Sequence, residues 1–156
     1  MTTGKPWDRF EPRRENILKM FHAAQEDGPT SRIGDEALAG IAEYLGISLA
    51  EASGVLSFYQ AFSREPRGQH VIRLCDSLSC RISGSLDVYQ AFRRALGIGR
   101  GETTADGRFT LEVVNCLGSC DTAPNVMIDG TLYTSVAPSD IDTILADALE
   151  AREDAV

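Results

Sequence analysis

The sequence predicts a mixed α/β (α+β) protein in which an N-terminal helical bundle, residues 1–66, precedes a domain with a mixed sheet, residues 67–156. Three observations predict this fold class. Apolar residues of the first third recur at the helical spacing i, i+3, i+4 and i+7. The Glu-Pro-Arg-Gly segment at residues 65–68 then opposes both helix and strand. Beyond this segment, strand-like and helix-like stretches alternate, as in proteins that pack helices against a sheet.

Three amphipathic helices are predicted in the first domain. The first stops at residues 27–29, Asp-Gly-Pro, and the second at Gly46, which is placed for a left-handed C-cap. Ser48 and Glu51 form a capping box for the third helix. The apolar faces that we expect to form the core are Ile17, Met20, Phe21 and Ala24 for the first helix, Leu38, Ile41, Ala42 and Leu45 for the second, and Val55, Tyr59 and Phe62 for the third.

A strand, a helix and a second strand open the second domain. Residues 70–74 are predicted as a short strand that ends at Cys75, and residues 84–96 return to the helical spacing. Residues 109–114 alternate apolar and polar side chains for most of their length before the chain reaches Cys116. This order is a βαβ unit, and we expect its two strands to be parallel neighbours.

A hairpin and a helix complete the second domain. Residues 126–128 and 132–134 flank the Asp-Gly pair at 129–130, the strongest short hairpin signal. The terminal helix is predicted to begin with Ser139 as its N-cap and Asp142 at the N3 position. The order of the whole domain is therefore β-α-β-β-β-α, which is thioredoxin-like, and one sheet backed by two helices is the expected layering.

Charge and hydropathy exclude several classes of function. The chain has 15 Lys and Arg against 23 Asp and Glu, a formal charge of -8, without a basic stripe interleaved with aromatic residues. Direct nucleic-acid binding is therefore disfavoured. The apolar runs are shorter than the roughly 18 to 20 residues that cross a bilayer, and the first residues contain no apolar signal-peptide core. We expect a cytoplasmic protein without direct membrane insertion.

Four cysteines form the strongest functional signal. Cys75 and Cys80 bound the first cysteine loop, residues 75–80, and Cys116 and Cys120 bound the second cysteine loop, residues 116–120. Each loop follows a predicted strand, and the carboxyl ends of parallel neighbouring strands meet at one edge of a sheet. Disulfides are not expected in a chain without an export signal. The sequence therefore predicts a metal or redox site, with a 2Fe-2S cluster as the leading interpretation.

Both cysteine loops are filled with small and polar residues, which can direct backbone N–H groups at sulfur. Such donors, together with nearby charges, set how readily an iron–sulfur cluster accepts an electron. Asp76 and Asp121 are expected to make reduction harder, and Arg73 and Arg81 to make it easier.

Three other interpretations of the cysteines stay open. Structural zinc also binds four thiolates, but its usual pairs are C-x2-C, a spacing that neither cysteine loop has. Thiol–disulfide exchange favours the same C-x-x-C spacing, and independent buried cysteines do not explain four at two strand ends. Elsewhere, His22 and His70 are expected to be surface or packing residues. The Gly-rich segment at 97–101 lacks the spacing of a dinucleotide fingerprint, so this chain alone is not expected to bind NAD or flavin.

Several motifs of the sequence are found together in one known family. They are Phe58-Tyr59 at the end of the helical region, Cys75-x4-Cys80, the Gly-x-Thr-Thr-x-Asp-Gly segment at 101–107, and Cys-Leu-Gly-Ser-Cys at 116–120 followed by Ala123-Pro124. From Phe58 onward, the chain resembles the thioredoxin-like 2Fe-2S subunit of NADH dehydrogenase modules. The resemblance covers nearly the whole chain, because this family also has an N-terminal helical bundle. In this fold a cis-proline often lies where Pro124 stands, and both a cis and a trans peptide stay open here.

The resemblance implies a non-catalytic electron-transfer subunit. Its 2Fe-2S cluster would be bound by Cys75, Cys80, Cys116 and Cys120. Its partner would be a flavoprotein subunit that carries FMN and binds NAD(H). The family works in respiratory complex I (NADH:quinone oxidoreductase), in NAD-linked hydrogenases, and in NAD-dependent formate dehydrogenases with a molybdenum subunit.

Among these settings, residues 126–133 look closest to the gamma subunits of formate dehydrogenase. We therefore predict an NAD-dependent formate dehydrogenase, with FMN, NAD and the molybdenum cofactor in partner subunits and a further iron–sulfur or molybdenum subunit as second partner. Complex I and a hydrogenase are the alternatives. An alternative of another class is a zinc-binding structural or assembly subunit.

Overall fold

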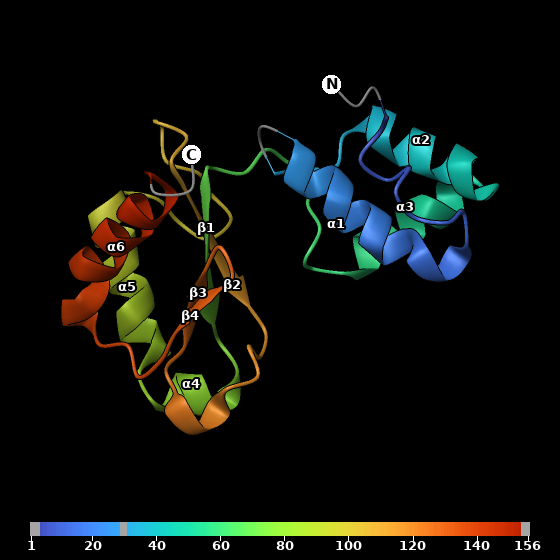
Figure 1. Cartoon of the computed structure of the whole chain (residues 1–156). Helices are drawn as coiled ribbons and strands as arrows, with labels where there is room; N and C mark the ends of the chain where they lie inside the picture. Colours follow the sequence, from blue (N-terminus) through green and yellow to red (C-terminus); the bar gives the residue numbers. More distant parts are fainter. Residues whose placement is uncertain (1–3, 29–30, 154–156) are drawn as a thin grey trace. The chain divides into compact units, whose positions relative to one another are not determined.

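The computed structural model describes residues 4–28 and 31–153 (Figure 1). The chain divides into two compact units, Met1–Arg67 and Gly68–Val156. In the described residues, every helix is too short or too polar to cross a membrane.

Helices α1 (Ile17–Asp27), α2 (Asp35–Leu45) and α3 (Leu49–Phe58) form the first unit, preceded by the 3₁₀ turn η1 (Arg14–Asn16). This confirms the predicted helical bundle. Gly46 ends α2 with a left-handed φ of 65°, as predicted, and the Ser48 hydroxyl accepts the Glu51 N–H at 3.2 Å. Buried side chains of its core are Trp7, Ile17, Met20, Phe21, Ala24, Ile33, Leu38, Ile41, Ala42, Ala52, Leu56 and Phe62.

The predicted apolar face of the third helix was wrong in part. Helix α3 ends at Phe58, so Tyr59 and Phe62 lie beyond it, and the buried residues of the helix are Ala52 and Leu56. The segment is apolar on several sides, and its sequence therefore fits more than one helical face.

The second unit is a mixed sheet covered by two helices. Its elements are β1 (His70–Cys75), α4 (Leu78–Ile82), α5 (Ser85–Leu96), β2 (Phe109–Val114), the 3₁₀ turn η2 (Cys120–Thr122), β3 (Val126–Ile128), β4 (Thr131–Tyr133), the 3₁₀ turn η3 (Pro138–Asp140) and α6 (Ile141–Glu153). The strand order is β2-β1-β3-β4. Strands β1 and β2 are parallel, and the other two pairings are antiparallel. The predicted mixed sheet is confirmed.

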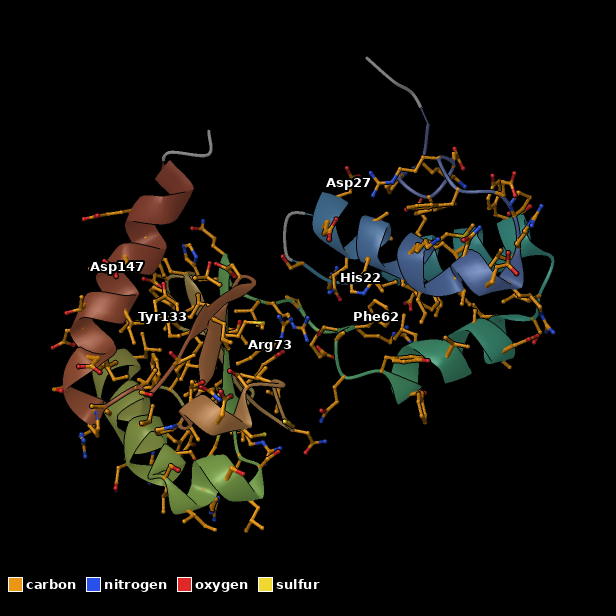
Figure 2. The ribbon with its side chains drawn as sticks, turned by 60° about the horizontal axis from the view of Figure 1, so that its bottom comes forward. His22, Asp27, Phe62, Arg73, Tyr133 and Asp147 are labelled. Atoms are coloured by element: carbon orange, nitrogen blue, oxygen red, sulfur yellow. The ribbon has the colours of Figure 1, made fainter. Side chains whose placement is uncertain are left out.

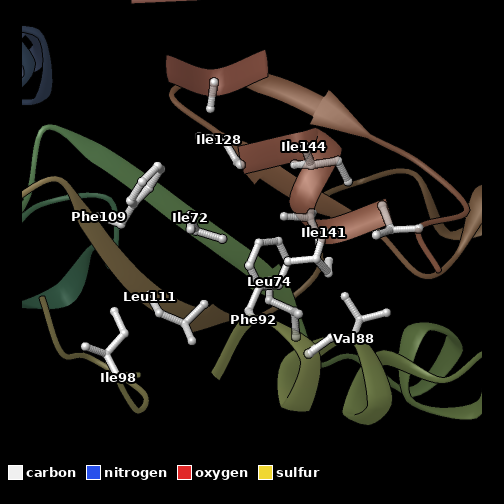
Figure 3. Packing of buried hydrophobic residues seen from close by; sticks show 14 residues of the cluster. Ile72, Leu74, Val88, Phe92, Ile98, Phe109, Leu111, Ile128, Ile141 and Ile144 are labelled. Atoms are coloured by element: carbon white, nitrogen blue, oxygen red, sulfur yellow. The ribbon is translucent and has the colours of Figure 1, made fainter. Parts of the chain in front are cut away.

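Helices α5 and α6 lie side by side against the sheet (Figure 1). Figure 3 shows the core between them, where side chains from the strands meet those from the two helices. Ile72 on β1, Leu111 on β2 and Phe92 on α5 are fully buried in this core. Burying each such side chain stabilises the fold by about 1.5–3 kcal/mol, which fixes the strands that lead to the cysteines.

The β3–β4 hairpin turns at the predicted Asp-Gly pair. Asp129 and Gly130 have φ values of 49° and 93°, which is the left-handed geometry that an Asp-Gly turn adopts most readily. The Asp129 carboxylate accepts the Val71 N–H at 2.9 Å and lies 2.6 Å from Nδ1 of His70. His70 is therefore a packing residue, as predicted.

Two predicted details of the second unit were wrong. Residues 78–82, predicted as part of a loop, form the short helix α4. The terminal helix α6 begins at Ile141 after the 3₁₀ turn that starts at Pro138, and the Asp140 carboxylate accepts the Ala137 N–H at 2.8 Å. The fixed φ of proline starts this turn earlier than the Ser139 cap that we predicted.

Candidate metal centre

The four cysteines lie at one edge of the sheet because β1 and β2 end there together. Cys75 is the last residue of β1 and pairs in register with Val114, the last residue of β2. Cys80 lies in α4, at the end of the sheet where β1 stops (Figure 1). Cys116 follows β2, and Cys120 begins a 3₁₀ turn. The sequence-based placement of both pairs at one sheet edge is therefore confirmed.

Hydrogen bonds connect the two cysteine loops at the sulfur atoms. The backbone N–H of Leu117, in the second loop, donates to the Cys75 sulfur in the first. The hydroxyl of Ser79, in the first loop, donates to the Cys120 sulfur in the second. These reciprocal contacts bring the two cysteine loops together, which the spacing in the sequence could not establish.

Within each pair the sulfur atoms are also in contact. Cys116 Sγ lies 3.3 Å from Cys120 Sγ, and the Cys80 thiol donates to the Cys75 sulfur. All four thiols are free. In the described ranges, no group of three or more His, Cys, Asp or Glu side chains is arranged to hold one metal ion. The arrangement of two adjacent thiol pairs fits a cluster of two irons, each with two cysteine ligands, better than a single tetrahedral zinc.

The two pairs differ in exposure. Cys75 and Cys80 are each 1% exposed, whereas Cys116 and Cys120 are exposed. A group bound between them would be shielded on the side of the first loop and open on the side of the second.

The thiol pKa values respond to this environment. Burial raises the pKa of Cys75, but donation from the Ser77 N–H, the Cys80 thiol and the Leu117 N–H lowers it below its ordinary value overall. Burial, together with the hydrogen bond and charge of Cys75, raises the pKa of Cys80. The hydrogen bond and charge of Cys116 raise the pKa of Cys120. Cys75 is thus the thiol best prepared to be a thiolate, which is the form that binds metal.

Backbone N–H groups point at sulfur in both cysteine loops, as predicted. The Gly118 N–H donates to Cys116 Sγ at 3.3 Å, and the Ser77 N–H donates to Cys75. Gly118 has a φ of +90°, a conformation that side-chain-bearing residues rarely adopt. Donors of this kind stabilise the negative charge of an iron–sulfur cluster.

The charged residues near the cysteines are paired. Arg81 Nη1 lies 2.6 Å and 2.8 Å from the two carboxylate oxygens of Asp76. Arg73, labelled in Figure 2, lies 3.3 Å from a carboxylate oxygen of Glu112. Asp121 is exposed. Because each predicted cation faces a carboxylate, we expect their effects on cluster reduction to cancel in large part.

Several other features carry no comparable chemistry. The exposed His22 packs its ring against the ring of Phe62, with 4.8 Å between the ring centroids. Burial, then the charges of Asp147 and Asp129, raises the pKa of Tyr133 (Figure 2). A cavity of about 600 Å³ in the first unit lies between α1 and α3 and is lined largely by apolar groups, among them Phe58.

The sequence missed three features of the site. The first is Asn125, which is 1% exposed and contacts both cysteine loops. The second is a set of exposed apolar side chains near Cys80 in the sequence, Leu78 and Ile82 of α4 and Leu86 of α5. The third is the choice of peptide geometry at Ala123-Pro124, left open by the sequence and cis in the structure.

Three comparisons place the chain among known proteins. Residues 5–149 match the profile of the family described as thioredoxin-like [2Fe-2S] ferredoxin. The E subunit of NADH-quinone oxidoreductase from Pseudomonas aeruginosa is 46% identical over 135 residues, 86% of this chain and 80% of the relative. Its counterpart from Escherichia coli K12 is 43% identical with equal coverage.

A crystal structure of an NAD+-reducing [NiFe]-hydrogenase in the air-oxidized state shares the fold, with a TM-score of 0.74 and 23% identity. It covers 87% of this chain, and this chain spans 23% of the hydrogenase chain. The fold class predicted from the sequence is therefore confirmed. Because its family profile extends over both compact units and the two E subunits named above exceed 40% identity, this chain belongs to the thioredoxin-like [2Fe-2S] ferredoxin family, whose cofactor is a 2Fe-2S cluster.

Proposed function

We propose that this chain is the 2Fe-2S electron-transfer subunit of an NADH:quinone oxidoreductase, with its cluster bound by Cys75, Cys80, Cys116 and Cys120. The observation that carries the proposal is the placement of both cysteine loops at one sheet edge, where Cys75 pairs in register with Val114 at the end of β2 and the Asn125 side chain contacts both Cys80 and the Ser119 carbonyl. It brings two thiol pairs together in a chain that is 43–46% identical to the matching subunits of two NADH-quinone oxidoreductases.

These relatives favour the NADH:quinone oxidoreductase alternative over the formate dehydrogenase predicted from residues 126–133. That segment forms the β3–β4 hairpin, in which Val126 and Ile128 are buried. Its apolar pattern is thus accounted for by strand packing and does not identify a parent enzyme. The hydrogenase alternative is supported at the level of the fold.

The side chains of the site have defined tasks in this proposal. A bound 2Fe-2S cluster supplies one-electron chemistry at the sheet edge. The four cysteines hold it as thiolates, and the N–H groups of Ser77, Leu117 and Gly118 stabilise negative charge on their sulfurs. The lowered pKa of Cys75, caused by hydrogen bonds that outweigh burial, favours its thiolate form.

The partner that we propose is a flavoprotein subunit with FMN and NAD(H), alongside further subunits of the complex. With a cluster held by the four cysteines, the subunit would exchange electrons with that flavin one at a time, each electron gained by one group being lost by the other. Leu78, Ile82 and Leu86 support docking near Cys80, since these apolar side chains are 75%, 79% and 48% exposed. Division into domains at residues 1–66 and 67–156 and a cytoplasmic location remain predictions.

Cluster content tests the proposal directly. The purified chain, reconstituted with iron and sulfide, is expected to hold about two irons and two sulfides, to be brown, and to give a paramagnetic signal after one-electron reduction. Ser57→Ala, a change in the first unit, serves as a control that keeps the cluster, whereas Cys75→Ser is expected to lose it. A colourless protein with one zinc per chain would support the structural subunit instead.

Activity of the purified complex identifies the parent enzyme. Antibody capture of this chain from its native cell extract is expected to bring down NADH:quinone activity together with FMN. Hydrogen-dependent or formate-dependent reduction of NAD in the captured complex would instead support the hydrogenase or the formate dehydrogenase.

A further inference from the structure

Asn125 lies outside both cysteine loops and contacts each of them, the first through its backbone and side chain and the second through its side chain. It follows the cis Ala123-Pro124 peptide and begins the turn into β3. Its side chain is 1% exposed. A buried amide costs free energy unless its donors and acceptors are satisfied, so its partners show what this position is built to hold.

Three groups of Asn125 face the first cysteine loop. Its backbone carbonyl accepts the Cys75 N–H at 3.1 Å. Its backbone N–H donates to the Cys80 sulfur. Its side-chain Nδ2 lies 4.0 Å from the same Cys80 sulfur. Two N–H donors of one residue are thus directed at one thiol.

The same side chain holds the second cysteine loop. Its Nδ2 donates to the Ser119 carbonyl, immediately before Cys120. Its Oδ1 accepts the Thr122 hydroxyl at 3.2 Å. The amide therefore connects residues on both sides of the site, over a separation of 45 residues to Cys80.

We propose that Asn125 is a positioning residue that holds the two cysteine loops in register and favours negative charge at the Cys80 sulfur. The inference rests on the proposed function, because it assigns a role toward a cluster bound by the four cysteines. Each electron added to such a cluster increases its negative charge, and N–H donors near the sulfurs favour the reduced form. Removing the amide should therefore make reduction harder.

A structural role alone would predict something different. If the amide only satisfied its buried partners, its loss would destabilise the chain and leave the equilibrium between oxidised and reduced protein unchanged. The reduction potential separates the two roles, since it compares two states of the same folded protein.

The test uses the full chain with its cluster. Asn125→Leu keeps the approximate volume and removes both the donor and the acceptor. Thr110→Val is the matched control, because Thr110 is also a buried polar residue with two side-chain hydrogen bonds, to Gly68 and Thr103. It lies near the beginning of β2, whereas the cysteines follow the ends of the strands. Redox titration followed by paramagnetic resonance is the main measurement, with thermal unfolding and iron content as companions.

In Asn125→Leu, the equilibrium constant for one-electron reduction is expected to fall about tenfold, which is about 59 mV for one electron. Iron is also expected to be lost faster on chelation. Thr110→Val is expected to lower the unfolding midpoint without shifting the potential. The inference would be overturned if the equilibrium constant for reduction of Asn125→Leu stayed within twofold of the wild-type constant.

Two further outcomes also decide it. A folded Asn125→Leu protein that cannot retain its cluster, beside a Thr110→Val protein that can, supports the positioning role. If Asn125→Leu does not fold, Asn125→Ser is titrated in its place, and failure of both variants to fold assigns Asn125 a structural role only. A wild-type chain without a 2Fe-2S cluster on the four cysteines would refute the proposed function, which is a separate result.

Discussion

The two cysteine loops carry the same number of thiols in very different surroundings. The first cysteine loop buries Cys75 and Cys80 almost completely and contains the start of helix α4. The second cysteine loop exposes Cys116 and Cys120 and turns through Gly118, with a φ of +90°. The first loop is thus part of the packed fold, and the second lies on the side that is open to solvent. The comparison teaches that one loop fixes the position of the site while the other leaves it accessible.

The largest expected effect comes from replacing one cysteine in either loop. Cys80→Ser and Cys120→Ser each remove one thiolate, but Cys80→Ser also leaves a hydroxyl in a buried position. We expect Cys80→Ser to abolish cluster assembly. We expect Cys120→Ser to retain part of it, because an exposed serine hydroxyl can form hydrogen bonds with water. Iron and sulfide per chain after reconstitution measure the difference. Equal iron content in the two variants would show that burial does not distinguish the loops.

The next effect concerns the outer surface of the first loop. Replacing both Leu78 and Ile82 by Gln is expected to weaken binding of the flavoprotein subunit about 30- to 900-fold, since each lost apolar contact contributes about 1–2 kcal/mol. The cluster and its potential should not change, because these side chains are 75% and 79% exposed. Binding of the purified partner by calorimetry gives the affinity. Leu49→Gln, at an exposed leucine of the first unit, is the control, and a loss of affinity as large as that of the double variant would contradict this assignment.

A smaller effect tests the turn of the second loop. Gly118→Ala adds a Cβ where the space is open but the backbone is left-handed, which costs about 1–2 kcal/mol. We expect faster iron release to a chelator, by about tenfold, with an unchanged optical spectrum. Gly54→Ala, at a helical glycine that also has open space, should not accelerate release. Unchanged release from Gly118→Ala would mean that this turn does not limit cluster retention.

The smallest effect lies at the ion pair of the first loop. Arg81→Ala leaves the Asp76 carboxylate without its 2.6 Å partner, and an exposed pair of this kind contributes about 0.2–1 kcal/mol. We expect the potential to fall slightly, because an unpaired negative charge disfavours reduction. In the Asp76→Asn and Arg81→Ala double variant the shift should disappear. A redox titration of Arg81→Ala, Asp76→Asn and the double variant measures these potentials. Identical shifts in Arg81→Ala and the double variant would show that the unpaired Asp76 carboxylate does not cause the shift.

Much of this site could be predicted from the sequence because both cysteine loops begin at the ends of regular strands. The alternating pattern of residues 109–114 and the apolar residues 70–74 located both strands, and parallel strands end at one edge. The Asp-Gly signal at 129–130 located the hairpin for the same reason, since the backbone geometry is local. Local patterns thus placed both cysteine loops at one sheet edge.

Tertiary contacts produced the features that the sequence could not predict. Helix α4 has five residues, too few to be stable by local propensity, and depends on packing. The amide of Asn125 contacts Cys80 across 45 residues of sequence, so no local sequence pattern predicts this contact. The prediction of a formate dehydrogenase rested on residues 126–133, whose pattern follows from strand burial rather than from function.

The central claim is that both cysteine loops bind one two-iron cluster, and iron anomalous diffraction from crystals of the reconstituted chain tests it most directly. The account predicts two iron positions between the loops, one bound by Cys75 and Cys80 and the other by Cys116 and Cys120. A single metal position that shows the zinc absorption edge, or iron bound away from these four sulfurs, would contradict it.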